Sequence, residues 1–256
     1  MKLLLLGSNG MLGNYLRTYF GSKYDLLSLT RKDLDLAIVD GAKIVDLLGS
    51  KVSTDDVIIN ASGIIKQRNP SVVDMIMVNA VVPHLLAKIK AELDCQIIHF
   101  TTDCVFSGQR GGYVETDPHD CLDDYGKSKS LGENPTLTII RTSIIGEEKN
   151  NKRSLLEWVR SNKGKTIDGY DNHLWNGVTC LELAKFVVQI IQVKNFWTGV
   201  RHIFSPDTVT KFELVNTIND IYNLEITVKN KSTPLNCYRN LSTVFHELPI
   251  TKPLAE

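Results

Sequence analysis

The sequence has no net charge and no long run of one charge sign. Lysine plus arginine and aspartate plus glutamate each number 29 in 256 residues, which gives a formal net charge of +0. Without a basic stretch, nothing in the composition favours a nucleic acid or an anionic membrane as partner. A small neutral or anionic ligand is the better expectation.

Long apolar runs and paired cysteine motifs are also absent. The apolar start 1–6 stops at Ser8, short of the roughly 7–15 residues of a secretion signal and the roughly 20 of a membrane span. We therefore expect a soluble, unprocessed protein with no membrane partner. The five cysteines are odd in number and form no Cys-x-x-Cys pair. This pattern predicts reduced thiols, a cytoplasmic location and no metal site.

Short apolar runs alternate with helical patterns over residues 1–146. Parallel βαβ units give this order, so the sequence predicts an α/β fold, a doubly wound parallel sheet of Rossmann type covered by helices on both faces. Strands are expected at 2–6, 24–30, 56–62, 95–102 and 137–143, and helices at 10–21, 39–48, 72–93 and 125–133.

The pattern is looser over residues 147–256, where we expect a smaller C-terminal α/β lobe for the substrate, part of which can return to the main sheet. Residues 163–179 read as one long loop, and long ordered loops in compact proteins tend to be functional. The helices expected here are 154–161, 180–193 and 211–222, with strands at 199–204 and 225–229.

The stretch GSNGMLG lies between the first expected strand and helix. Gly7 suits a tight turn, Gly10 a close approach of backbone to a pyrophosphate, and Gly13 close packing of helix on strand. The helix N-terminus adds partial positive charge for phosphates. The spacing is GxxGxxG rather than GxGxxG, but its position at a strand–helix junction favours dinucleotide binding over an ordinary glycine-rich turn.

The end of the second expected strand bears on which dinucleotide binds. A carboxylate there would hold the ribose 2′-hydroxyl of NAD(H), whereas a cation suits the 2′-phosphate of NADP(H). Thr30, Arg31 and Lys32 stand at this point. NADP(H) is therefore preferred, NAD(H) stays open, and Asp33 or Asp35 remains able to reach the adenosine.

Two further motifs suggest carbonyl chemistry. In YGKSK, Tyr125 and Lys129 share one helix face, and a nearby ammonium lowers the pKa of a phenol from about 10. HFTTDCVFSG ends a central strand, where Thr101 or Thr102 can offer a hydroxyl to the same carbonyl. Alone, each motif also fits a plain structural role, as a surface pair or a strand end.

Together, GSNGMLG, NASG at 60–63, TTDCVFSG and YGKSK resemble the extended short-chain dehydrogenase/reductases. TDxVFxG, followed by GGYVETD and YGKSKSLGE, is most similar to the dTDP-4-dehydrorhamnose reductase branch. The resemblance covers at least residues 2–146. It implies an NADP(H)-dependent reductase of a nucleotide-linked 4-keto-6-deoxy sugar in deoxysugar and surface polysaccharide biosynthesis, and it leaves the sugar, the nucleotide and a homodimeric state open.

Carried over by position, the resemblance makes Tyr125 the general acid, Lys129 the residue that tunes it and holds the nicotinamide ribose, and Thr102 the hydroxyl that polarises the ketone. Thr101 competes for that role or contacts the cofactor. Asp35 matches a position that meets adenine, and Asn79 a helix asparagine that supports the site. The implied cofactor contacts are Gly7, Asn9, Gly10, Met11, Leu12, Gly13, Arg31, Asp35, Leu36, Asn60, Ala61, Ser62, Gly63, Asn79, Thr101, Tyr125 and Lys129.

The sequence departs from some relatives at Cys104. Related 4,6-dehydratases carry a glutamate there, so a dehydratase is disfavoured. A cysteine resembles the GDP-fucose synthase type, which leaves a combined epimerase and reductase using Cys104 and His173 as one alternative. The alternative of another class is a non-catalytic nucleotide-binding or regulatory subunit.

Candidate substrate contacts follow from the same layout. Arg239 has forked donors that suit a diphosphate, and Trp175 lies either in the binding cleft or between packed lobes. The full set is Cys104, Val105, Phe106, Trp175 and Arg239, with Asn176 beside them.

Overall fold

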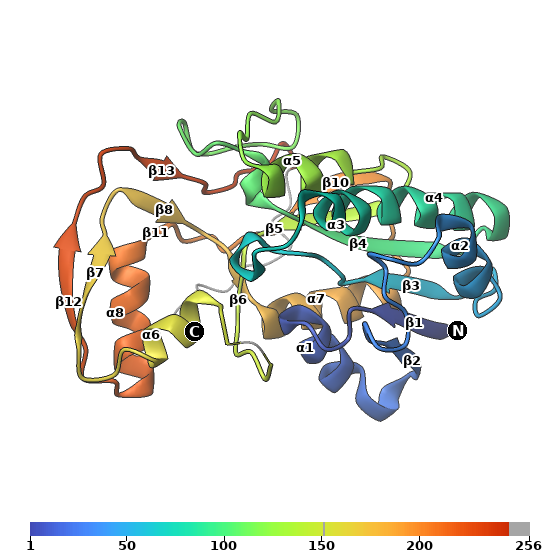
Figure 1. Ribbon diagram of the computed structural model, residues 1–256, viewed down its shortest axis with the longest axis horizontal. Helices are drawn as coiled ribbons and strands as arrows, with labels where there is room; N and C mark the ends of the chain where they lie inside the picture. Colours follow the sequence, from blue (N-terminus) through green and yellow to red (C-terminus); the bar gives the residue numbers. More distant parts are fainter. Residues whose placement is uncertain (151, 246–256) are drawn as a thin grey trace.

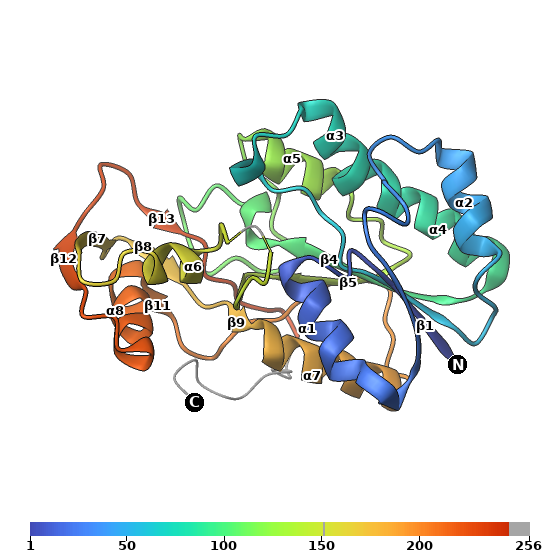
Figure 2. The same ribbon diagram turned by 60° about the horizontal axis from the view of Figure 1, so that its bottom comes forward.

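The structure, a computed structural model, describes residues 1–150 and 152–245 and has a larger and a smaller lobe (Figures 1 and 2). The larger lobe contains a six-stranded parallel sheet in the order β10-β5-β4-β3-β1-β2. The predicted doubly wound α/β sheet is confirmed. Its strands are β1 (Lys2–Leu6), β2 (Asp25–Leu29), β3 (Val57–Asn60), β4 (Gln96–Thr102), β5 (Thr138–Thr142) and β10 (Gly199–His202).

Helices cover both faces of this sheet (Figure 1). Helices α1 (Met11–Phe20) and α7 (Cys180–Gln192) pack on one face with Leu3 and Leu5, and α2 (Gly41–Gly49) and α4 (Val82–Leu93) pack on the other with Leu4 and Leu6. Successive strand side chains point to opposite faces, so a strand covered on both sides needs an unbroken apolar run. This explains the four consecutive leucines.

The helical run Val72–Leu93 is divided where one long helix was expected. It consists of α3 (Val72–Ile76), the π-helical turn η3 (Met77–Val81) and α4. Pro83 stands in the first turn of α4, directly after η3, and because proline has no backbone N–H the helical bonding of the run is interrupted at this point. Within the residues described, this run is long and apolar enough to cross a membrane by composition, but 50% of its most apolar window is buried inside the protein.

The smaller lobe has its own core, formed by helices and short strands around Trp175, Leu214 and Ile218. The expectation of one long loop over 163–179 is wrong, because three strands form there. They pair with partners distant in sequence, in the arrangements β12-β7, β11-β8-β13 and β6-β9. The elements are α6 (Leu155–Arg160), α8 (Lys211–Tyr222), β6 (Ile144–Ile145), β7 (Thr166–Tyr170), β8 (His173–Trp175), β9 (Val178–Thr179), β11 (Val209–Thr210), β12 (Thr227–Lys231) and β13 (Cys237–Tyr238).

The chain passes between the lobes more than once. After β8 it returns through β9, α7 and β10 to the large lobe, and it then forms α8 and β12 in the small one. A last crossing brings Leu241 beside Tyr113 in a β-bridge, where Asn176 bonds both the N–H and the C=O of Leu241 at 2.8 Å. The lobes are therefore joined by several connecting segments of the chain. The remaining helices are α5 (Asp124–Leu131) and the short 3₁₀ turns η1 (Gly21–Lys23), η2 (Lys66–Arg68) and η4 (Asp103–Val105).

Candidate active site

The turn between β1 and α1 requires glycine. Gly7 has φ +72°, and a Cβ built there would lie 2.7 Å from the Cα of Ser62. A Cβ at Gly13 would lie 2.1 Å from the carbonyl oxygen of Gly7, so α1 can approach β1 only without a side chain at that point. These contacts give Gly7 and Gly13 the turn and packing roles that the sequence predicted.

A pocket of about 560 Å³ opens above this turn. It lies at the carboxyl ends of β1, β2 and β3, where the strand order reverses and open α/β sheets bind ligands. Its lining is Leu6, Gly7, Asn9, Gly10, Leu29, Thr30, Arg31, Lys32, Leu34, Asp35, Leu36, Ala37, Ala61, Ser62, Gly63, Ile64, Val78 and Asn150.

The residues present fit a dinucleotide. The N-cap of α1 is Gly10, which has no side chain to bond the first-turn N–H groups, and no acidic residue lies in that turn. The first N–H groups of α1 are thus free to bind a phosphate, and the glycines of the adjacent turn leave room for it. Nine predicted cofactor residues line the pocket: Gly7, Asn9, Gly10, Arg31, Asp35, Leu36, Ala61, Ser62 and Gly63.

The other predicted cofactor residues lie outside this lining, and their roles stay predictions. Met11, Leu12 and Gly13 form the start of α1. Asn60 is fully buried beneath the pocket, where its Oδ1 accepts from the backbone N–H of Ser62 at 3.2 Å and its Nδ2 contacts His99 Nδ1 at 3.1 Å.

Asn79 connects the pocket to α5. Its Nδ2 donates to the carbonyl of Ile64 at 2.9 Å and to Ser128 Oγ at 3.1 Å, and its Oδ1 accepts from the N–H of Ile64 at 2.9 Å. The π-helical turn η3 carries this fully buried side chain, and such turns are frequent at functional sites. Asn79 therefore fixes the pocket wall relative to α5 without lining the pocket.

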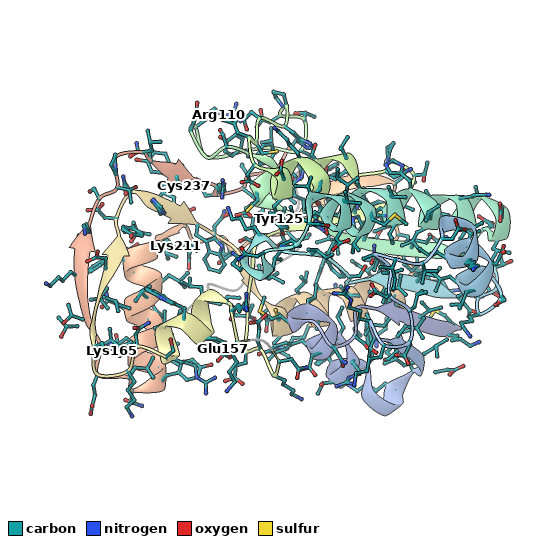
Figure 3. The ribbon with its side chains drawn as sticks, in the orientation of Figure 1. Arg110, Tyr125, Glu157, Lys165, Lys211 and Cys237 are labelled. Atoms are coloured by element: carbon teal, nitrogen blue, oxygen red, sulfur yellow. The ribbon has the colours of Figure 1, made fainter. Side chains whose placement is uncertain are left out.

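Helix α5 brings Tyr125 to the end of β4. Asp123 caps the helix by accepting from the N–H of Gly126 at 2.8 Å. A Cβ on Gly126 would lie 2.3 Å from the carbonyl oxygen of Cys104, so this glycine allows the close approach. The Tyr125 phenol consequently lies beside the Thr102 hydroxyl. Figure 3 shows Tyr125 on the side of the large lobe that faces the small lobe.

The structure distinguishes between the two threonines. Thr102 meets Tyr125, whereas Thr101, the preceding strand residue, points to the other face of the sheet. Thr101 is 5% exposed, and its Oγ1 has no hydrogen-bond partner among the described residues. The geometry favours Thr102 as the hydroxyl that acts with Tyr125.

The expected lowering of the Tyr125 pKa by Lys129 is wrong in this structure. Burial raises the pKa of Tyr125, the charges of Cys104 and Asp103 raise it further, and the neighbouring Thr102 hydroxyl acts in the opposite direction. Lys129 Nζ instead donates to the carbonyl of Phe100 at 2.8 Å. Burial lowers the pKa of Lys129 to about 8, with Glu133 acting in the opposite direction.

Because the charged ammonium of Lys129 is buried, we expect it to lower the free energy of unfolding. Between about pH 8, the pKa in the folded protein, and 10.5, the ordinary value, the unfolded chain binds more protons than the folded one. The free energy of unfolding should therefore rise with pH across this window. Lys129→Met is expected to increase the free energy of unfolding by about 2 kcal/mol at pH 7. This gain over wild type should vanish by about pH 10.5. Urea unfolding of the cofactor-free protein measures both.

Lys127→Met, two residues away on the exposed side of α5, is the matched control. It should leave the free energy of unfolding within about 0.5 kcal/mol of wild type. A Lys129→Met variant less stable than wild type at pH 7 would contradict the burial argument.

The predicted pair Cys104 and His173 is not joined by a hydrogen bond within the described residues. Burial, followed by the charge of Asp103, raises the pKa of Cys104 to about 12, so its thiol is protonated near neutral pH. His173 Nε2 contacts Thr233 Oγ1 at 2.9 Å, and its ring packs on Tyr170 with centroids 4.9 Å apart. All five cysteines are free thiols.

Three predicted substrate contacts have buried side chains. Val105 and Phe106 are 0% exposed in an apolar cluster, and Phe106 stacks on Tyr113 with centroids 4.2 Å apart. Their side chains pack in this core, and their contact with a substrate stays a prediction. Trp175 is 4% exposed, and its Nε1 donates to Ser143 Oγ at 2.7 Å.

The sequence reasoning missed Asp103, Lys211 and Asn150. Asp103 stands inside TTDCVFSG, next to Thr102, so the motif could have indicated it. Its Oδ1 accepts from Thr102 Oγ1 at 3.0 Å. Lys211 comes from the small lobe and Asn150 from the segment after β6, and only the fold brings them to the site. No cluster of three or more His, Cys, Asp or Glu side chains suited to a metal occurs in 1–150 and 152–245.

Comparison with known proteins gives related sequences over most of the chain. A dTDP-4-dehydrorhamnose reductase of Aggregatibacter actinomycetemcomitans is 28% identical over 241 residues, covering 86% of this chain and 78% of that protein. The spore coat polysaccharide biosynthesis protein SpsK of Bacillus subtilis is 24% identical over 244 residues, covering 91% and 83%. Methionine adenosyltransferase 2 subunit beta of Xenopus laevis is 27% identical over 180 residues, covering 62% and 53%.

Solved structures share the fold. A hypothetical dTDP-4-dehydrorhamnose reductase from Sulfolobus tokodaii superposes with a TM-score of 0.80 at 24% identity, covering 94% of this chain and 92% of that one. A dTDP-4-dehydrorhamnose reductase from Bacillus anthracis in complex with NADP has a TM-score of 0.81 at 20% identity, covering 99% and 95%.

The family resemblance inferred from the motifs is confirmed across both lobes. The model of the family described as RmlD substrate binding domain matches residues 1–240, which includes every candidate site residue named above. This chain belongs to the RmlD substrate binding domain family.

Proposed function

We propose that the protein is an NADP(H)-dependent reductase of a nucleotide-linked 4-keto-6-deoxy sugar, acting in the cytoplasm in deoxysugar and surface polysaccharide biosynthesis. The observation that carries this proposal is the meeting of Thr102 and Tyr125 at the end of β4, beside a glycine-lined pocket at the point where the strand order reverses. The names of the relatives support the same class of substrate.

The site residues suit protonation of a ketone. Bound NADPH would supply the hydride. Tyr125 donates a proton to the ketone oxygen, and the raised pKa of its phenol keeps that proton in place near neutral pH. Thr102 Oγ1 lies beside the phenol, so both hydroxyls face the place that the ketone oxygen would take.

Lys129 places a positive charge beside the wall of the pocket. Its ammonium is anchored on the carbonyl of Phe100, and a Cβ on Gly63 would lie 3.7 Å from its Nζ. The charge is thus held where Gly63 forms the pocket wall. This position suits contact with the ribose next to the nicotinamide.

Reduction is favoured over a combined epimerase and reductase. Epimerisation needs a base that removes a proton beside the ketone. The Cys104 thiol, with its pKa raised to about 12 by burial, stays protonated, and His173 is bonded to Thr233. A reductase without epimerase activity needs neither group as a base.

Turnover with a substrate panel tests the proposal. Purified protein is mixed with NADPH and dTDP-, UDP- and GDP-linked 4-keto-6-deoxy sugars, and the loss of nicotinamide absorbance is followed. Oxidation that depends on one of these ketones would support the reductase. NADPH binding without oxidation by any of them would favour the non-catalytic subunit instead.

The preference for NADP(H) is expected to depend on Arg31. Its Nε pairs with Asp35 Oδ2 at 2.9 Å at the edge of the pocket, next to Thr30 and Lys32. Since charge-assisted bonds to phosphate contribute about 1.5–3 kcal/mol, Arg31→Ala should raise the KM for NADPH roughly tenfold or more. Steady-state kinetics with NADH is the internal control, because NADH has no 2′-phosphate. Equal weakening of both cofactors would refute a phosphate contact.

A further inference from the structure

The imidazole of His99 is buried in the large lobe, next to the residues beneath the cofactor pocket. It is 0% exposed on β4 and stands directly opposite Asn60, the last residue of β3. The two strands lie side by side in Figure 1. Ile97, two residues earlier on the same face of β4, packs in the apolar core between the sheet and helices α2 and α4. His99 is thus a polar exception on an apolar face.

A single side-chain hydrogen bond accounts for this histidine. Asn60 Nδ2 and His99 Nδ1 are 3.1 Å apart, whereas His99 Nε2 has no partner within residues 1–150 and 152–245. A buried polar atom without a partner lowers stability, and leucine at this position would avoid that loss. The bond to Asn60 is therefore what a histidine provides here and an apolar residue does not.

The direction of this bond follows from the other partners of Asn60. Its Oδ1 accepts from the backbone N–H of Ser62 at 3.2 Å and from the Ser62 hydroxyl. Because a backbone N–H can only donate, the amide oxygen faces Ser62 and the Nδ2 donor faces His99. His99 Nδ1 accepts this bond, which requires a neutral ring with its proton on Nε2. Burial, followed by the charge of Lys129, lowers the pKa of His99 well below 6.5, in agreement with a neutral ring.

Ser62 lies where the wall of the pocket meets the glycine turn. Ala61, Ser62 and Gly63 line the pocket. A Cβ on Gly7 would lie 2.7 Å from both the Cα and the N of Ser62. The N–H of Ala61 donates to the carbonyl of Leu6 at 3.2 Å, at the end of β1. A shift of Ser62 would therefore displace the glycine turn together with the pocket wall.

We propose that His99 is a positioning residue for the dinucleotide. It fixes the amide of Asn60, and the amide oxygen fixes the backbone of Ser62, against which the cofactor binds. This inference rests on the cofactor of the proposed function and adds a residue that does not itself touch the cofactor.

Loss of the acceptor at residue 99 should act on the cofactor-free protein. The Asn60 amide is then free to turn, and the N–H of Ser62 loses a fixed partner. Part of the protein would have a displaced pocket wall. Because binding must first restore that wall, the apparent affinity falls in proportion to the fraction that remains competent.

Two substitutions of nearly equal size test the acceptor. His99→Leu removes it, whereas His99→Asn keeps an oxygen close to the position of Nδ1. Both lose the rest of the ring, so the cavities that they leave are similar. Ile139→Val is the control for a loss of packing alone, because Ile139 is 0% exposed and stands opposite His99 on β5.

Calorimetry measures the affinity of each variant for NADPH. His99→Leu is expected to weaken binding roughly tenfold, the result of a competent fraction of about one tenth. His99→Asn should recover most of this loss. Ile139→Val should lower the thermal midpoint while its affinity stays within about twofold of wild type. At saturating NADPH, kcat of His99→Leu for ketone reduction should also stay within about twofold, because the bound cofactor restores the wall.

Two NMR measurements on the cofactor-free protein need no turnover. The Ser62 amide should exchange with solvent roughly tenfold faster in His99→Leu than in wild type, and His99→Asn should restore slow exchange. Imidazole ¹⁵N shifts of wild type near neutral pH should show His99 with a proton on Nε2 and none on Nδ1.

Three results would overturn the inference: His99→Leu binds NADPH as tightly as wild type, His99→Asn binds it as weakly as His99→Leu, or the Ser62 amide exchanges equally fast in all three proteins. The two proposals fail separately. NADPH binding that depends on the acceptor at residue 99, without ketone reduction, keeps this inference and overturns the reductase. Ketone reduction with an unchanged KM for NADPH in His99→Leu does the reverse.

Discussion

Tyr125→Phe is expected to lower kcat for ketone reduction by about 10²- to 10⁴-fold, the contribution of a positioned general acid. The variant loses the phenolic proton and keeps the ring that packs at the end of β4. Tyr125 places this phenol beside the Thr102 hydroxyl. Lys129 Nζ is engaged with the carbonyl of Phe100. Single-turnover oxidation of NADPH measures the effect.

Two observations separate this loss from misfolding. The affinity for NADPH should change far less than kcat, because most of the predicted cofactor contacts line a pocket that does not include Tyr125. The thermal midpoint should also stay near that of wild type. If Tyr125→Phe turned over at more than a tenth of the wild-type rate, the proton would come from another donor, and the assignment of Tyr125 would be wrong.

The parts of the site that the sequence predicted depend on short-range spacing. Gly7, Gly10 and Gly13 lie within one strand–helix turn, and their steric need is local, since a Cβ at two of them would strike neighbouring backbone. Tyr125 and Lys129 are four residues apart on α5. Because such distances are set by the helix or the turn itself, they are readable without the fold.

The parts that the sequence did not predict depend on contacts between distant segments. Strand β7 (Thr166–Tyr170) pairs with β12 (Thr227–Lys231), and no local pattern marks that partnership. Lys211 approaches Asp103 only because the small lobe packs over the end of β4. The direction of the Tyr125 pKa shift also required the fold, because burial raises this pKa and Lys129 Nζ donates to the carbonyl of Phe100.

Glu133→Gln is expected to destabilise the folded protein by about 3–5 kcal/mol, the cost of leaving a buried charge without its partner. Arg141 on β5 is 1% exposed, and its guanidinium donates to both carboxylate oxygens of Glu133. Its other donors go to His202 Nε2 at 2.8 Å and His119 Nε2 at 2.7 Å. Burial, followed by the charge of Arg141, lowers the pKa of His202 to about 4, so this imidazole is a neutral acceptor.

Glu133 is thus the only carboxylate within 4.0 Å of Arg141 in the described part of the chain, and it stands just beyond the end of α5. The Glu133→Gln variant keeps the shape of the side chain and loses its charge, so the thermal midpoint should fall by roughly 6–20 °C. Glu92→Gln breaks an exposed pair with Lys88 and should cost less than about 1 kcal/mol. Adding Arg141→Met to Glu133→Gln should recover stability, because both charges are then gone. A double variant no more stable than Glu133→Gln would show that packing around Glu133, rather than the unpaired charge of Arg141, sets the loss.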